Sequence, residues 1–264
     1  MVALRHSTLE TPRTAEEAMA LAWQFESVVA DTKRGFWDDR RINLKRALRE
    51  FAPDGDRRFI GPAIIHALNQ YAVDHPGDVK AQTALGLAYA TTYDESVILF
   101  GHEHMTMFDA TETRYADAFF MKACAALLHA NRIDHLDPLP LRLLTRLLID
   151  YGKHAPTAEQ KRSAYEQAEA TFARVLGLNM GSADPHDLGV MAEIYKGLGD
   201  DETAALCQEW SEKKMRYSDA DREKAAVVGK KLYNAFHRFR RDRIRVEPAA
   251  GPSREQGTNG LALN

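Results

Sequence analysis

The residues best suited to chemistry are the two histidines and the glutamate of the segment Gly101-His102-Glu103-His104-Met105. Imidazole and carboxylate groups are common metal ligands, and Asp117 and His129 stand further along the chain to complete a ligand shell. On an α-helix, side chains two positions apart point about 200° away from each other, so both histidines could face one ion only on an extended or looped segment. We therefore favour a turn with solvated histidines. A helical metal-binding protein or oxidase subunit that uses this segment is the alternative.

Recognisable catalytic motifs do not occur in the rest of the sequence. It contains no HExxH metal-binding pair, no GxSxG nucleophile, no P-loop and no glycine-rich dinucleotide motif. Cys124 stands among alanines and leucines, which predicts a buried and unreactive thiol, and Cys207 is interpreted in the same way. The sequence thus gives no argument for an enzyme, and we expect no cofactor.

The composition is that of an ordinary globular protein. The chain has 264 residues, of which 45% are hydrophobic and 28% are charged, and its net charge is −3. This charge argues against a general attraction to nucleic acid or acidic membranes, and two cysteines are too few for a disulfide scaffold. The N-terminus shows no secretory signal, and the most apolar stretch, residues 116–130, carries charges and is shorter than the roughly 20 residues of a membrane span. We expect a cytoplasmic protein without a transmembrane segment.

Apolar residues recur at helical spacing through most of the chain, which predicts an all-α protein. Thr14 followed by Glu17 has the spacing of a capping box and begins the first helix, and Gly35 breaks it. The remaining helices are predicted over residues 38–51, 62–74, 79–89, 115–129, 144–152, 157–176, 187–197, 201–217 and 218–246.

Part of the sequence resembles the tetratricopeptide-repeat family. Met191 is followed by Tyr195 at +4, Gly199 at +8 and Ala204 at +13, and the stretches Leu85–Tyr89 and Leu147–Gly152 carry parts of the same pattern. The resemblance implies antiparallel helix pairs stacked as a TPR-like α-solenoid, a fold that mostly binds proteins or peptides.

The spacing of the repeats is irregular. The motif tyrosines Tyr89, Tyr151 and Tyr195 are 62 and 44 residues apart, against a family period of about 34. The helix pair expected near residues 89–110 has Ile98 where the family has a small residue at the crossing of the two helices.

These observations divide the chain into five parts. They are a flexible N-terminus (1–12), a helix pair that acts as a cap (13–60), the repeat-like region (61–217), a basic capping helix (218–246) and a disordered tail (247–264). The expected function is that of a non-catalytic scaffold or adaptor, with a protein or peptide bound on the first helices of the pairs. The residues expected to contact this partner are Gln82, Tyr89, Arg142, Arg146 and Tyr195.

The last predicted helix is strongly basic. Residues 218–264 carry ten Lys and Arg against six Asp and Glu, a charge of +4 that leaves −7 for residues 1–217. A terminal helix that covers the last repeat with its apolar side is the favoured interpretation. The alternative is an arm that binds nucleic acid, an acidic partner or an anionic surface through Lys230, Lys231, Arg238, Arg240, Arg241 and Arg243.

Overall fold

The computed structural model describes residues 10–32, 43–44, 46–47, 60–100, 110–179, 184–212 and 219–241, and within these residues it contains helices and no strand. The prediction of an all-α protein is confirmed. The helices are α1 (Ala15–Thr32), α3 (Gly61–Asp74), α4 (Val79–Phe100), α5 (Ala110–Ile133), α6 (Leu139–His154), α7 (Ala158–Leu178), α8 (Pro185–Gly197), α9 (Asp201–Glu212) and α10 (Asp219–Arg241).

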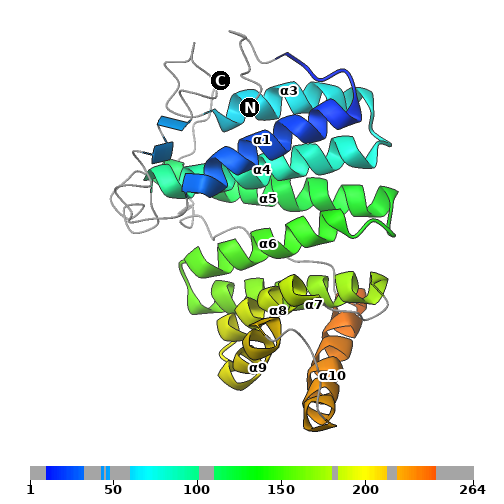
Figure 1. Cartoon of the computed structure of the whole chain (residues 1–264). Coiled ribbons are helices and arrows are strands. Elements are labelled where there is room, and N and C mark those ends of the chain that lie inside the picture. Colours follow the sequence, from blue (N-terminus) through cyan, green and yellow to red (C-terminus); the bar gives the residue numbers. More distant parts are fainter. Residues whose placement is uncertain are drawn as a thin grey trace, which may run out of the picture.

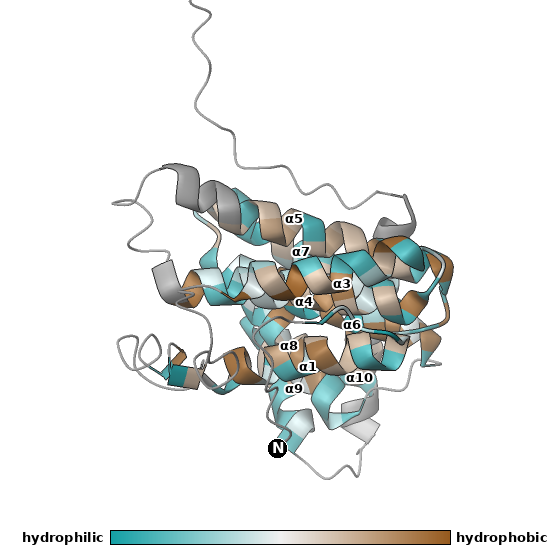
Figure 2. Cartoon of the chain, turned by 90° about the horizontal axis from the view of Figure 1, so that it is seen from above, coloured by the Kyte–Doolittle hydropathy of each residue, from teal (hydrophilic) through white to brown (hydrophobic). Residues whose placement is uncertain are grey.

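The helices form a stack that follows the order of the chain. Figure 1 shows α3 and α1 at one end, α4 to α7 in the middle and α8 to α10 at the other end. The closest neighbours are α4 with α5, α6 with α7 and α8 with α9, while α1 packs on α4 and α10 packs on α7. Seen along the stack, α5 and α7 lie on one side, α1, α8 and α9 lie on the other, and α4 and α6 lie between them (Figure 2).

The caps of α8 and α9 follow from local sequence. Asp184 accepts a hydrogen bond from the backbone N–H of Asp187 at 2.7 Å, and Asp187 accepts one in return from the N–H of Asp184. Gly199 lies between α8 and α9 with a φ of 78°, a left-handed conformation that glycine adopts without steric cost. The first helix is capped by Thr14, whose side chain accepts from the N–H of Glu17.

The long helix α4 differs from the sequence prediction, which ended it at Tyr89. It continues to Phe100, because the hydroxyl groups of Thr92 and Ser96 donate to helix carbonyls four residues earlier and can therefore be buried. Ile98 consequently lies within α4, and the partner of α4 is α5. The close approach of the two helices occurs at Gly86, where an added Cβ would lie 2.7 Å from the side chain of Leu127.

A buried carboxylate holds the start of α3. Glu95 of α4 is fully buried and accepts hydrogen bonds from the backbone N–H groups of Ile60 at 3.0 Å and Gly61 at 2.9 Å. These N–H groups have no partner within the helix, so Glu95 satisfies two of them at once. Burial raises the pKa of Glu95 to about 7, against the opposing effect of the two hydrogen bonds.

Three aromatic rings connect α4, α5 and α6 in the core. Phe120 stacks on Tyr151 with the ring centroids 4.1 Å apart, and the ring of Tyr93 lies 5.8 Å from that of Phe120. Contacts of this kind add to the stabilisation from burial and fix α6 relative to α4. In the part of the chain that is described, the helices do not combine the length and the apolar character that crossing a bilayer requires.

Candidate partner-binding groove

An apolar groove of about 450 Å³ runs over α6. Most of its lining residues belong to α6, with others from α1, α7 and α8. Helices α1 and α8 lie on the same side of α6 (Figure 2). The groove is lined by Trp23, Leu139, Arg142, Leu143, Thr145, Arg146, Ile149, Asp150, Lys153, Phe172, His186, Val190 and Glu193.

The floor of the groove is one face of α6. Arg142, Arg146, Ile149 and Lys153 follow one another at intervals of four, three and four residues, which places them in a single row along the helix. The opposite face of α6 is buried in the stack, with Leu144 and other leucines in the core. At a rise of about 1.5 Å per residue, the row from 142 to 153 is roughly 16 Å long, or three helical turns.

Ion pairs connect the floor of the groove to both walls. Arg146 donates to Glu26 of α1 at 2.8 Å, and Lys153 donates to Glu193 of α8 at 2.8 Å. Arg142 pairs with the carboxylate of Asp187, the buried residue that also caps α8. The charged groups of the groove are therefore already engaged with each other, and the surface between them is apolar.

Trp23 is the most exposed apolar side chain of the groove. It projects from α1, is 37% exposed and lines the same cavity as Val190 of α8. Tryptophan is enriched among the residues that contribute most to protein–protein affinity, because its large ring buries much apolar area when a partner covers it.

A small cavity adjoins the groove at the side of α4. It has a volume of about 20 Å³ and shares Leu143, Arg146 and Asp150 with the groove. The other residues that line it are Glu26, Leu87, Ala90, Thr91, Asp94 and Leu147. We call this cavity the acidic notch, because three of its lining residues are carboxylates and one is a cation.

The structure brings two of the five expected partner-binding residues, Arg142 and Arg146, into the groove. Gln82 is buried and donates to the backbone carbonyl of Ala72. Tyr89 is half-buried and lies beside Phe119 of α5, and Tyr195 is buried in the core. These three side chains therefore stand outside the groove.

The residues of the groove and the notch that the sequence analysis did not identify include Trp23, Glu26, Ile149, Asp150 and Glu193. Ile149 and Asp150 follow from the periodicity of α6 once its exposed face is known. Trp23 and Glu26 belong to a helix more than a hundred residues away, and no local pattern connects them to α6.

The residues proposed as metal ligands are not assembled within the described chain. His102 and His104 lie outside it. Asp117 and His129 are on α5 twelve positions apart, which corresponds to roughly 18 Å along a helix, too far to share one ion. The described residues contain no group of three or more His, Cys, Asp or Glu side chains that could hold a metal.

The basic C-terminal helix packs on α7, and its buried or partly buried side chains include Val228, Leu232 and Ala235. Lys231 points inward, pairs with Asp200 in the turn between α8 and α9, and lies 5.6 Å from the centre of the Tyr195 ring. Lys230 is exposed. The side chains of Arg238, Arg240 and Arg241, and the whole of Arg243, lie outside the described residues.

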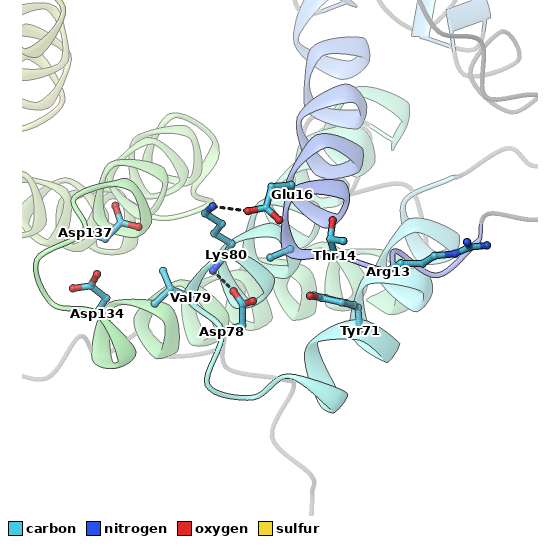
Figure 3. Close-up of a pocket in the computed structure, with 10 residues that line it drawn as sticks. Arg13, Thr14, Glu16, Tyr71, Asp78, Val79, Lys80, Asp134 and Asp137 are labelled. Atoms are coloured by element: carbon cyan, nitrogen blue, oxygen red, sulfur yellow. Dashed lines mark hydrogen bonds and ion pairs between the residues drawn. The ribbon is translucent and has the colours of Figure 1, made fainter.

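A second, more open hollow of about 630 Å³ lies where the N-termini of α1 and α4 meet the turn between α5 and α6. Figure 3 shows Lys80 reaching across it to Glu16 at 2.8 Å, and the hydrogen bond from Lys80 lowers the pKa of Glu16. Asp78, Asp134 and Asp137 accept hydrogen bonds from backbone N–H groups of the helix starts and the turn. The carboxylates of this hollow thus hold backbone N–H groups or Lys80, and the apolar groove is the stronger candidate site.

Comparison with known proteins adds no assignment: no protein-family model, no curated protein and no solved structure matches the chain.

Proposed function

We propose that this protein is a non-catalytic scaffold or adaptor that binds a helical segment of a partner protein in the groove between α1, α6 and α8. The observation that carries the proposal is the apolar groove of about 450 Å³ with the partly exposed ring of Trp23 at its wall. The resemblance of Met191, Tyr195, Gly199 and Ala204 to the tetratricopeptide-repeat motif supports the same function, since such folds mostly bind proteins or peptides.

A single α-helix is the occupant that suits the shape of the groove. Its floor is a helix whose row of lining side chains extends for about three turns, and its walls are two further helices. A helix that places residues i, i+3, i+4 and i+7 in such a groove buries an apolar stripe, as in other helix-in-groove complexes.

The energetics favour binding through apolar contact. The cations of the floor already pair with Glu26, Asp187 and Glu193, so a partner gains little from pairing with them again. Burial of Trp23 and Val190 supplies the main driving force, at about 25 cal/mol for each Å² of apolar surface.

Site-specific crosslinking in the native host tests the proposal. A photoreactive residue is placed at Val190 in the groove and, as a matched control, at Val227, which is 58% exposed on α10 and outside the groove. We expect one discrete crosslinked partner from position 190 that is absent from position 227. Trp23→Ala should abolish it while the variant still unfolds in one cooperative thermal transition. The same products from both positions, or none from position 190, would exclude the groove as the binding site.

A further inference from the structure

The acidic notch has more carboxylates than cations among its lining residues. Glu26, Asp94 and Asp150 lie around the guanidinium of Arg146, and Lys153 of the groove pairs with Asp150 at 3.4 Å, which leaves three carboxylates against two cations. Burial lowers the pKa of Arg146, but the attraction of these three carboxylates outweighs it and the pKa is raised. Leu87, Ala90, Leu143 and Leu147 form the rest of the lining. Excess negative charge in such apolar surroundings is poorly solvated and is stabilised by a further cation.

A buried hydroxyl group in the notch has an unused hydrogen-bonding capacity. Thr91 lines the notch and is 2% exposed, and its Oγ1 has no hydrogen-bond partner in the described part of the chain. Thr92 and Thr145 are equally buried, but each donates to the carbonyl oxygen four residues earlier. A buried polar atom without a partner is costly, so a ligand group or water in the notch would be favoured.

We propose that the acidic notch is a recognition subsite for one Lys or Arg side chain on the partner's helix. This inference rests on the proposed function, because the side chain arrives from a helix that lies in the adjoining groove. The methylene stem of the Lys or Arg lies over Leu143, which the notch and the groove share, and its N–H groups meet Asp150, Glu26 and the hydroxyl of Thr91.

Access to the notch depends on Arg146. Its side chain is 48% exposed and long, so its charged end can move into solvent while Glu26 and Asp150, 16% and 18% exposed, remain near their positions. The notch of about 20 Å³ holds about one water in the closed arrangement, and movement of Arg146 enlarges it. A partner Glu or Asp is disfavoured because it adds to the negative charge, and an apolar side chain leaves Thr91 without a partner.

Selection from a displayed library of helical peptides tests this subsite. The probe is a 15-residue amphipathic helix with a constant apolar stripe and randomised polar positions, selected on the full chain. We expect Lys or Arg to be enriched at one fixed position relative to the stripe. Replacement of that residue by Met should weaken binding about tenfold, the effect expected for a hydrogen-bonded charge.

Two variants test whether the preference for Lys or Arg arises in the acidic notch. Asp150→Asn and Thr91→Val should each reduce the preference for Lys over Met at least threefold. Thr145→Val is the matched control, because Thr145 also lines the groove while its hydroxyl group is occupied by the carbonyl of Leu141. It should leave the preference unchanged.

The possible outcomes separate the subsite from the proposed function. Peptides whose binding requires Trp23 but shows no preference for Lys or Arg would overturn the proposed cation subsite. The proposal that the groove binds a partner helix would still stand. A preference for Lys or Arg that neither Asp150→Asn nor Thr91→Val reduces would also overturn the proposed subsite. The peptide cation would then bind at another place on the protein. A selection that yields no peptide dependent on Trp23 would overturn both the proposed cation subsite and the proposed function of the groove.

Discussion

The ring of Tyr165 fills the space that a side chain on Gly152 would occupy. A Cβ at Gly152 would lie 2.8 Å from Cε2 of Tyr165, and the same ring occupies the space beside Gly197 at the end of α8. Tyr165 of α7 is thus buried against the backbones of α6 and α8, the two helices that form the floor and one wall of the groove.

Gly152→Ala should destabilise the protein by about 1–3 kcal/mol, because the ring of Tyr165 has to move for the new methyl group. Gly189→Ala is the matched control, since no atom lies within 4 Å of a Cβ added there and alanine is the better helix former. We expect a gain of up to about 1 kcal/mol for this control. Urea denaturation measures both, and equal gains would show that Tyr165 does not restrict Gly152.

The carboxyl group of Glu95 should make stability fall as the pH rises. Its pKa is raised from 4.5 to about 7 in the folded protein, so the folded state holds a proton that the unfolded state has lost between these values. The contribution lost over this interval is about 3 kcal/mol. Glu95→Gln removes the titration, so the stability of this variant relative to the parent should rise between pH 4.5 and 8.

Denaturation at several pH values measures this difference. Glu16→Gln is a flat control in this window, because the hydrogen bond from Lys80 lowers the pKa of Glu16 and its contribution therefore changes only below about pH 4.5 and is constant above it. A constant difference between Glu95→Gln and the parent at all pH values would contradict the burial of a titrating carboxyl group.

Docking of α10 can be tested with two neighbouring valines. Val228 is 4% exposed and faces the core, whereas Val227 is 58% exposed. Val228→Ala should cost about 1–2 kcal/mol through lost burial and a small cavity, and Val227→Ala should change stability by less than about 0.5 kcal/mol. Thermal unfolding distinguishes the two, and equal effects would show that α10 does not pack on α7 through Val228.

Both cysteines should resist alkylation in the native protein. Burial raises the pKa of the Cys124 thiol to about 12 and that of Cys207 to about 11, and both side chains are almost inaccessible. Treatment with iodoacetamide at pH 8 followed by mass spectrometry should show no modification until denaturant is added. Rapid labelling of either thiol without denaturant would indicate local opening of α5 or α9.

The sequence predicted best what depends on neighbouring residues. The end of α8 at Gly197 was predicted correctly and its start two residues late, and the Asp184–Asp187 box and Gly199 explain these ends by capping rules that act over a few residues. The buried thiol of Cys124 followed from its apolar surroundings on one helix. Helical periodicity also identified α6, although its predicted start was five residues late.

Features that depend on contacts between distant segments were not predictable in the same way. From the sequence alone, Glu95 is expected to be an exposed helix residue. In the structure, two backbone N–H groups at the start of α3 donate to its carboxyl group. Tyr195 and Gln82 were expected on a binding face and are buried, because a degenerate repeat motif does not specify the rotation of a helix within the stack. Trp23 reaches the groove only because α1 packs across α4.

The contact of α1 with α4 also sets an order of events during synthesis. α1 ends at Thr32 and α4 begins at Val79, whereas α6 and α7 are separated by three residues. At a translation rate of roughly 5–20 residues per second, α1 leaves the ribosome several seconds before the last turn of α4 does. Its apolar side, which includes Phe25, lacks the surface of α4 during that time. One wall of the groove is therefore completed only after α4 has emerged.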